Sequence, residues 1–214
     1  METMEIINFL ARWGHLLFGM TWIGLLYYFN FIQGGYFKKA TPEALADAKK
    51  HLAPAALWWF RWGAMFTFLT GLVLLVGVMK LGYLNAGIVL GATMGTLMFL
   101  NVWLIIWPNQ KIALGMVEGD GPAAGAKALL ASRTNTLFSG PMAFFMLAGG
   151  HAGGLGFGWG TGMGSTAMWV GLAIIAALEV NAIVGKQGTM TTVKGVITSS
   201  LVLTAVLVAV LKLV

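Results

Sequence analysis

The sequence contains no cysteine, which excludes several kinds of chemistry at once. Disulfide bonds, thiolate metal sites and the C-x-x-C-H attachment of c-type haem all require cysteine. Charge is scarce as well, because Asp, Glu, Lys and Arg together make up only 9% of the 214 residues. Soluble domains carry about 25% charged residues, and a chain with so few could not cover its own surface in water.

Motifs of hydrolases and nucleotide-driven proteins are also missing. The sequence has no Ser-His-Asp order, no H-E-x-x-H, and no Walker or Rossmann glycine pattern. The net charge of +6 does not indicate nucleic-acid binding, because the 13 Lys and Arg lie mainly in short loops between apolar segments. Glu2 and Glu5 stand where a signal peptide has basic residues, so no signal peptide is expected.

Apolar sequence dominates, with 58% hydrophobic residues and a mean hydropathy of +0.83. Since a bilayer core takes about 20 residues of helix, the sequence predicts a single all-α transmembrane domain over residues 1–214, with about six spans. Thr41 and Pro42 are expected to begin a short polar helix after the first span, and Pro108 to stop the third. The expected spans are 6–37, 55–78, 85–107, 136–152, 167–184 and 193–214.

Positive charge is unevenly distributed between the two faces of this bundle. One face has only Lys80 and Lys212, with Arg12 inside the first span. The other face has Lys38, Lys39, Lys49, Lys50, Lys111, Lys127, Arg133, Lys186 and Lys194, and Arg61 just inside the second span. Because cytoplasmic loops are rich in Lys and Arg, both termini are expected outside, which is the periplasm for a bacterial inner (cytoplasmic) membrane.

Glycine recurs every four residues in the third span, at Gly87, Gly91 and Gly95. Such a row of small residues allows another helix to approach closely. The alternative is a groove that admits a flat cofactor.

Ionisable groups within a membrane span are energetically costly and are often functional. Among them, His15 in the first span is the most distinctive. Gly19 follows one turn later and Trp22 lies on the same face, an arrangement that suits a haem ligand because glycine leaves room for the macrocycle. The alternative is a buried histidine bonded to another helix. His151 is the candidate for a second axial ligand, with Met142 or Met146 as substitutes. The alternative is that His151 is an ordinary loop residue.

Arg61 lies in the tryptophan-rich segment LWWFRWGAMF. It is interpreted either as a snorkelling arginine of an interfacial aromatic belt or as an anion-binding residue for a haem propionate, a quinone oxygen or an anionic substrate. The remaining candidates are polar groups within or beside the spans. They are Arg12, His51, Asn101 and Glu179. His51 is interpreted either as a surface residue or as a member of the Arg61 site. Glu179 is interpreted either as part of an ion pair or as active in proton transfer.

Three stretches resemble a known family. They are RWGHLLFGMTWIGLLYYFNF (12–31), APAALWWFRWGAMFTFLTG (53–71) and NVWLIIWPNQK (101–111). They are similar to the membrane domain of bacterial membrane-bound urate hydroxylases, the urate oxidase N-terminal domain family. The first span also resembles, more loosely, the haem-binding first helix of the membrane protoporphyrinogen oxidase family, which again points to His15.

The resemblance implies urate oxidation, with electrons leaving through a cytochrome c that the family carries at its C-terminus. This chain departs from that pattern because it ends at Val214 without cysteine, so a cytochrome c partner is expected to be a separate chain. The leading hypothesis is a membrane oxidoreductase component with b-type haem on His15, passing electrons from a small urate-like reductant or a quinol to that cytochrome. A non-catalytic anchor of a respiratory or dehydrogenase complex is the main alternative, and a small-molecule carrier a weaker one. The expected partners are the lipid bilayer, the cytochrome or respiratory-complex subunits, and a second copy of the chain.

Overall fold

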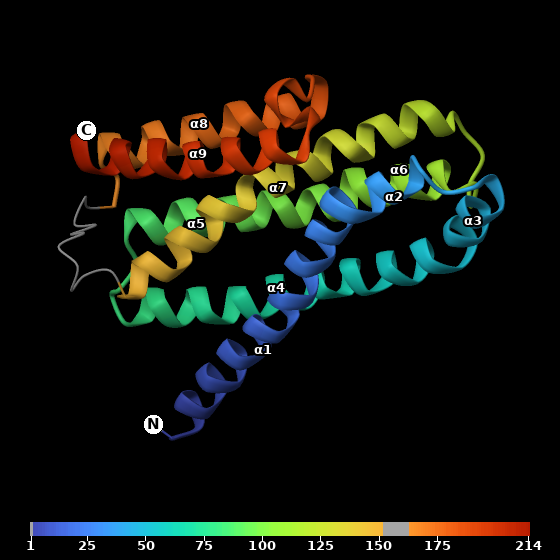
Figure 1. Ribbon diagram of the computed structural model, residues 1–214. Coiled ribbons are helices and arrows are strands. Elements are labelled where there is room, and N and C mark those ends of the chain that lie inside the picture. Colours follow the sequence, from blue (N-terminus) through green and yellow to red (C-terminus); the bar gives the residue numbers. More distant parts are fainter. Residues whose placement is uncertain (1, 152–162) are drawn as a thin grey trace. The chain divides into compact units, whose positions relative to one another are not determined.

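A computed structural model of the chain describes residues 2–151 and 163–214, with side chains for residues 3–148 and 163–214. This part of the chain is helical, without strands (Figure 1). The elements are α1 (Glu2–Tyr27), η1 (Tyr28–Gln33), α2 (Gly34–Phe37), α3 (Pro42–Asp47), η2 (Ala48–Leu52), α4 (Ala53–Lys80), α5 (Ala86–Leu100), η3 (Asn101–Ile106), α6 (Trp107–Ala113), α7 (Gly121–His151), α8 (Thr166–Val184), η5 (Gly188–Thr191) and α9 (Val193–Leu213).

Several helices are long and apolar enough to cross a membrane, as the sequence predicted. The qualifying stretches in the described residues are Thr3–Phe37, Pro42–Lys80, Ala86–Ala113, Thr166–Val184 and Val193–Leu213. The helix expected to be the fourth span, α7, is not among them, because its middle turns carry Ser, Thr, Asn and Arg. The sixth span therefore stays a prediction.

The segment expected to be a polar loop before the fourth span is largely helix. Helix α6 runs to Ala113, and α7 begins at Gly121, far ahead of the expected Thr136. The start of α7 follows local rules, since the Ala123 N–H donates to Asp120 Oδ1 at 3.0 Å and alanine favours helix in the next turns. One consequence is that Arg133, expected in this loop, lies inside α7 and is buried.

Pro108 does not stop the third span, contrary to the sequence prediction, because α6 continues through it. The preceding segment η3 is π-helical, with the Trp107 N–H bonded to the carbonyl of Val102 five residues earlier. This wider turn places the proline at the start of α6, where its missing N–H costs no α-helical bond. A similar π-helical segment, η1, follows α1.

The chain forms two compact units. The first comprises Met1–Gly77 with Phe99–Ser132, and the second Val78–Met98 with Arg133–Val214.

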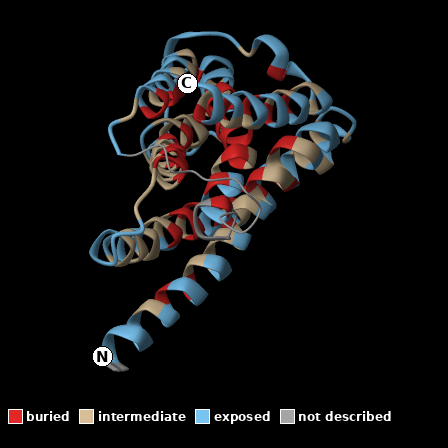
Figure 2. Ribbon diagram, turned by 90° about the vertical axis from the view of Figure 1, so that its left-hand side faces the viewer, coloured by how far each residue is buried: buried red, intermediate tan, exposed pale blue. Residues whose placement is uncertain are grey.

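In the first unit α4 packs antiparallel against α1 on one side and against η3 and α6 on the other. Gly63, Thr67 and Gly71 form a row of small residues that faces α1, where a Cβ placed on Gly63 would lie 3.2 Å from the backbone nitrogen of Trp22. On the opposite side Phe68 stacks on Phe99, with ring centroids 4.2 Å apart. Large apolar side chains remain exposed along the outer face of α1, as expected for contact with lipid (Figure 2).

In the second unit the glycine row of α5 faces α7. A Cβ on Gly91 would lie 3.4 Å from both the Met142 carbonyl oxygen and the Met146 nitrogen, so backbone fills the space beside it. The row is a helix-packing surface and leaves no groove for a flat cofactor. Helices α8 and α9 lie side by side, and Gly171 on α8 contacts Leu90 of α5.

Candidate functional site

His15 is held by the backbone of α4 in the first unit. Its Nδ1 lies 2.9 Å from the carbonyl oxygen of Thr67 and 3.3 Å from Thr70 Oγ1. Because a carbonyl oxygen can only accept, Nδ1 carries the proton and donates this hydrogen bond. Nε2 of the neutral ring then keeps its lone pair. This is the tautomer and the type of second-shell bond found for histidines that ligate metals.

The space around the imidazole comes from Gly71 on α4. A Cβ placed on Gly71 would lie 3.0 Å from His15 Cε1 and 3.4 Å from Nδ1, closer than ordinary contact. At Gly19, which the sequence singled out for this role, a Cβ would meet only Thr67 Cγ2 at 3.9 Å. Gly71 therefore positions His15, while a Cβ at Gly19, one turn further along α1, would make only an ordinary contact with Thr67.

Trp22 is buried in the helix contact that follows His15. Its side chain is 2% exposed, and its Nε1 has no hydrogen-bond partner. Its backbone passes close to Gly63, which fixes the indole between α1 and α4. A buried indole N–H without an acceptor is unusual in proteins.

Arg61 stacks on an aromatic ring. Its Cζ lies 3.4 Å from the ring centroid of Trp107 on α6, and Lys111 Nζ lies 5.5 Å from the same centroid. The side chain of Arg61 is 9% exposed, and its Nη1 is buried without a partner. Arg61 precedes Thr67 by six residues of α4, a rise of about 9 Å, so this group lies at a different depth from His15.

Other buried polar atoms of the first unit lack partners too. On η3 the Nε1 of Trp103, whose ring centroid lies 5.8 Å from that of Trp62, is unbonded. The buried acceptors without a hydrogen-bond partner are Asn30 Oδ1, Gln33 Oε1 and Gln110 Oε1. Asn30 lies on the π-helical segment η1 and Trp103 on the π-helical segment η3.

The remaining sequence candidates do not join His15 within its unit. Arg12 is exposed, and exposed His51 is bonded to Asp47 Oδ1 at 2.9 Å. Asn101 is buried in η3, whereas Glu179 lies on α8 of the second unit. Met142 and Met146 also belong to the second unit, and the side chain of His151 lies outside the described residues. No cluster of three potential metal ligands occurs among the described residues.

Sequence reasoning missed the polar turns of α7. Residues 131–139 are all buried, and they include Arg133, whose Nε and Nη1 have no partner. The amide of Asn135, 0% exposed, donates to the Met98 carbonyl at 2.9 Å. The signal was present as an unbroken S-R-T-N-T run, but it was assigned to a loop and a helix start.

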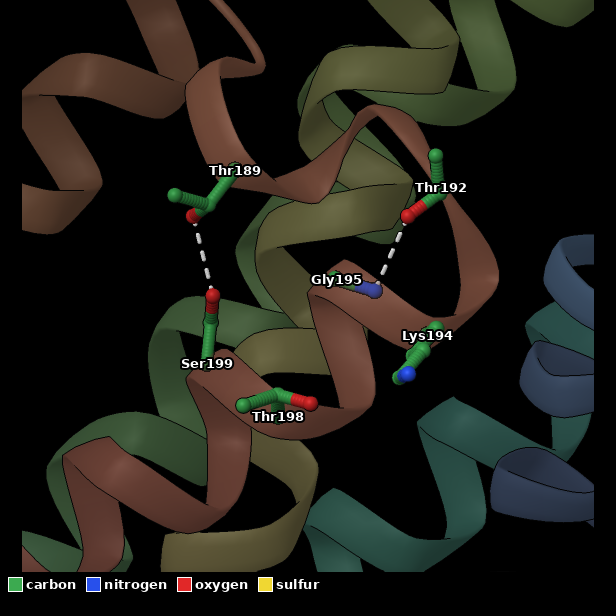
Figure 3. A pocket seen from close by; sticks show the side chains of 6 residues that line it. All are labelled: Thr189, Thr192, Lys194, Gly195, Thr198 and Ser199. Carbon is green, nitrogen blue, oxygen red and sulfur yellow. Dashed lines mark hydrogen bonds between the residues drawn. The ribbon is translucent and has the colours of Figure 1, made fainter.

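The second unit also has a shallow depression of about 410 Å³ beside the start of α9 (Figure 3). Thr192 Oγ1 there accepts the Gly195 N–H at 2.9 Å, and Thr189 and Ser199 share a hydrogen bond of 2.9 Å. These hydroxyls cap the helix and tie the α8–α9 connection to it, so they serve the local fold.

Comparison with known families identifies the chain. The sequence profile described as urate oxidase N-terminal matches residues 82–212, more than half of the sequence. The chain belongs to the urate oxidase N-terminal family. Of the three stretches that carried the resemblance, only NVWLIIWPNQK falls within the match, so the family signal lies mainly in the half that the resemblance did not use. His15 and Arg61 precede the matched part. Neither the curated proteins nor the solved structures contain a match to this family member.

Proposed function

We propose that this urate oxidase N-terminal family member is a membrane-embedded oxidoreductase component that binds b-type haem through His15. It passes electrons from a small urate-like reductant or a quinol to a separate periplasmic cytochrome c. The observation that carries the proposal is the hydrogen bond from His15 Nδ1 to the Thr67 carbonyl, which leaves Nε2 as a free ligand in an apolar helix pair. Family membership supports the urate-related role.

His15 can supply one axial ligand of a haem, and the other axial ligand would come from a different residue. His15 supplies an oriented axial nitrogen, and Gly19, one turn away on α1, adds no side chain beside it. A haem bound there would supply one-electron transfer at a potential set by its ligands. The second axial ligand stays a prediction from the sequence.

The test is the spectrum of the purified protein. From haem-replete cells, the reduced-minus-oxidised difference spectrum is expected to show the α-band of b-type haem, with close to one haem per chain. The reduced protein is expected to transfer electrons to a soluble c-type cytochrome. Protein that is purified intact and shows no such band contradicts the proposal.

We further propose that α7 crosses the bilayer as the sixth span, with both termini on the periplasmic side of a bacterial inner membrane. The distribution of Lys and Arg supports this arrangement. Alkaline phosphatase fused after Val214 is expected to be active, and green fluorescent protein at the same position dark. The reverse result would mean that the number of crossings is odd or the orientation inverted.

The anchor alternative depended on glycine-rich faces free to hold a partner. In the structure, the faces at Gly63 and Gly91 are covered by α1 and α7 of the chain itself. The anchor alternative predicts co-purification with dehydrogenase or respiratory subunits and no cofactor of its own.

A further inference from the structure

We infer that Arg133 of α7 and the start of α9 form a binding site for the phosphate group of an anionic phospholipid. The site lies within the second unit, beside the connection between α8 and α9. The inference rests on the part of the proposed function that places these helices in a membrane. It depends neither on haem nor on the substrate of the proposed reaction.

Arg133 lies on the face of α7 that packs against α9. A Cβ placed on Gly140 would meet the Ser200 side chain, and Arg133 precedes Gly140 by seven residues, close to two helical turns. Asn135, which bonds to α5, points to the opposite side of α7. Helices α7 and α9 run in the same direction (Figure 1), and two turns before Ser200 lies Val193, the first residue of α9. Arg133 is therefore level with the start of α9.

The guanidinium of Arg133 has two nitrogen atoms without a hydrogen-bond partner. The residue is 9% exposed, and its Nε and Nη1 are buried without an acceptor. Glu179 is the only Asp or Glu in the sequence of the second unit, and it makes no hydrogen bond with either atom. A buried cation without a counter-charge is costly, and in membrane proteins such residues typically mark a ligand or ion site. Arg133 can therefore donate two hydrogen bonds to an anion.

The start of α9 offers donors of its own. The first backbone bond of this helix runs from the Val196 N–H to the Thr192 carbonyl at 3.0 Å. The N–H groups of Val193 and Lys194 come before that bond and stay outside the helical ladder. Long side chains on a helix lean toward its N-terminus, so Arg133 extends past the first turn of α9, where these N–H groups point. The guanidinium and the positive end of the helix dipole favour an anion at the same place.

A second cation lies on the other side of this turn. Lys194 is exposed, and it lines the depression beside α9 together with Thr198, one turn further along (Figure 3). Arg133 from the buried side and Lys194 from the exposed side thus flank the free N–H groups of the helix. A phosphate group has enough oxygen atoms to accept from a guanidinium, an ammonium and a helix N-terminus at once.

The position of the site favours a lipid over a soluble phosphate. Helices α8 and α9 are both long and apolar enough to cross a membrane, so their connection lies at a membrane surface, where headgroups are found. Ile197 and Leu201 are exposed on α9 directly after the site and offer an apolar surface for acyl chains. Lys186 and Lys194 add positive charge that attracts anionic headgroups more strongly than zwitterionic ones.

The experiment measures lipid binding to the full chain in maltoside detergent by native mass spectrometry. Phosphatidylglycerol is the probe, phosphatidylcholine the zwitterionic control and inorganic phosphate the soluble competitor. Phosphatidylglycerol is expected to bind at least about tenfold more tightly than phosphatidylcholine, because two cations face its phosphate. Inorganic phosphate at the same concentration is expected not to displace it. Equal binding of the two lipids, or displacement by equimolar phosphate, overturns the inference.

Variants locate the site. Arg133→Gln is expected to weaken phosphatidylglycerol binding at least about tenfold, because it removes a buried charge-assisted donor. Lys194→Gln should weaken it about fivefold, as expected for one cation near a headgroup. Lys212→Gln, exposed at the opposite end of α9, is the matched control and should bind like the wild type. Unchanged affinity in Arg133→Gln with normal thermal unfolding would show that the site is wrong.

A variant that fails to fold does not leave the inference untested. If Arg133→Gln is not stable, Arg133→Lys and Lys194→Gln decide. Arg133→Lys keeps the charge and loses the fork of donors, so it should bind phosphatidylglycerol several-fold more weakly than the wild type. Wild-type affinity in both variants overturns the inference.

This inference and the haem proposal fail separately. The α-band of b-type haem is recorded on the same preparations, and His15→Ala is expected to bind phosphatidylglycerol like the wild type because His15 belongs to the first unit. Selective phosphatidylglycerol binding in a protein without a haem band supports the lipid site and contradicts only the haem. Parallel loss of haem and lipid in Arg133→Gln would indicate a damaged fold, which overturns the assignment to Arg133.

Discussion

The His15→Ala protein is expected to lose the b-type haem band almost completely, with haem content falling at least about tenfold. Removing only a second-shell partner of a ligating histidine typically costs 10–100-fold in affinity, so removing the ligand itself should cost at least as much. The imidazole is fixed by the Thr67 carbonyl, and no other described histidine of the first unit is held in this way. Pyridine haemochrome assay and the reduced-minus-oxidised spectrum measure the effect.

Two controls separate ligation from general damage. His51→Ala removes an exposed histidine bonded only to Asp47, and it should leave haem content unchanged. Thr70→Val removes the longer 3.3 Å contact while keeping the Thr67 carbonyl, so haem should be retained. Full haem content in His15→Ala, or equal loss in all three variants, would rule out His15 as the ligand.

Gly63→Leu is expected to give the largest loss of stability. The Cβ alone would lie 3.2 Å from the Trp22 nitrogen and 3.4 Å from the Phe18 carbonyl oxygen, and these backbone atoms cannot rotate away. Helix α1 would have to move off α4. Overpacking of this kind costs about 1–3 kcal/mol or more, and a chain of this size loses about 2–4 °C in Tm per kcal/mol. Thermal unfolding in detergent should therefore show a fall of several degrees.

Gly24→Leu is the matched control, because it adds the same side chain to α1 at a position where a Cβ meets nothing within 4 Å. Its Tm should stay close to that of the wild type. Similar Tm values for the two variants would mean that α1 does not pack on α4 through Gly63.

The helical spans could be predicted from the sequence because each span depends on the hydrophobicity of its own segment of about 20 residues. The continuation of the helix through Pro108 could not be predicted. In η3 the Asn101 side chain is buried and Trp103 packs on Trp62, and no local sequence pattern distinguishes this π-helical turn from an α-helical end. The early start of α7 was within reach, since Asp120 and Pro122 are ordinary helix-start residues.

The sequence could predict which residues belong to the candidate site, but not which residues they contact. His15, Trp22 and Arg61 stood out because polar and aromatic groups are informative within apolar spans. Their partners lie far along the chain, with Thr67 and Gly71 around His15 and Trp107 beneath Arg61. Gly19 was favoured over Gly71 because spacing along one helix can be read from sequence, whereas the register between two helices cannot.

The polar middle of α7 has a consequence for how the protein is made. In our proposed topology a translocon must accept a segment whose Ser, Thr, Asn and Arg side chains are poorly suited to lipid. Its packing partners are synthesised at different times. Gly91 of α5 is already present when α7 emerges, whereas Ser200 of α9, which contacts Gly140, follows more than fifty residues later. Helix α7 therefore depends on its neighbours for stable insertion, and biogenesis is expected to be completed only after the last helix has left the ribosome.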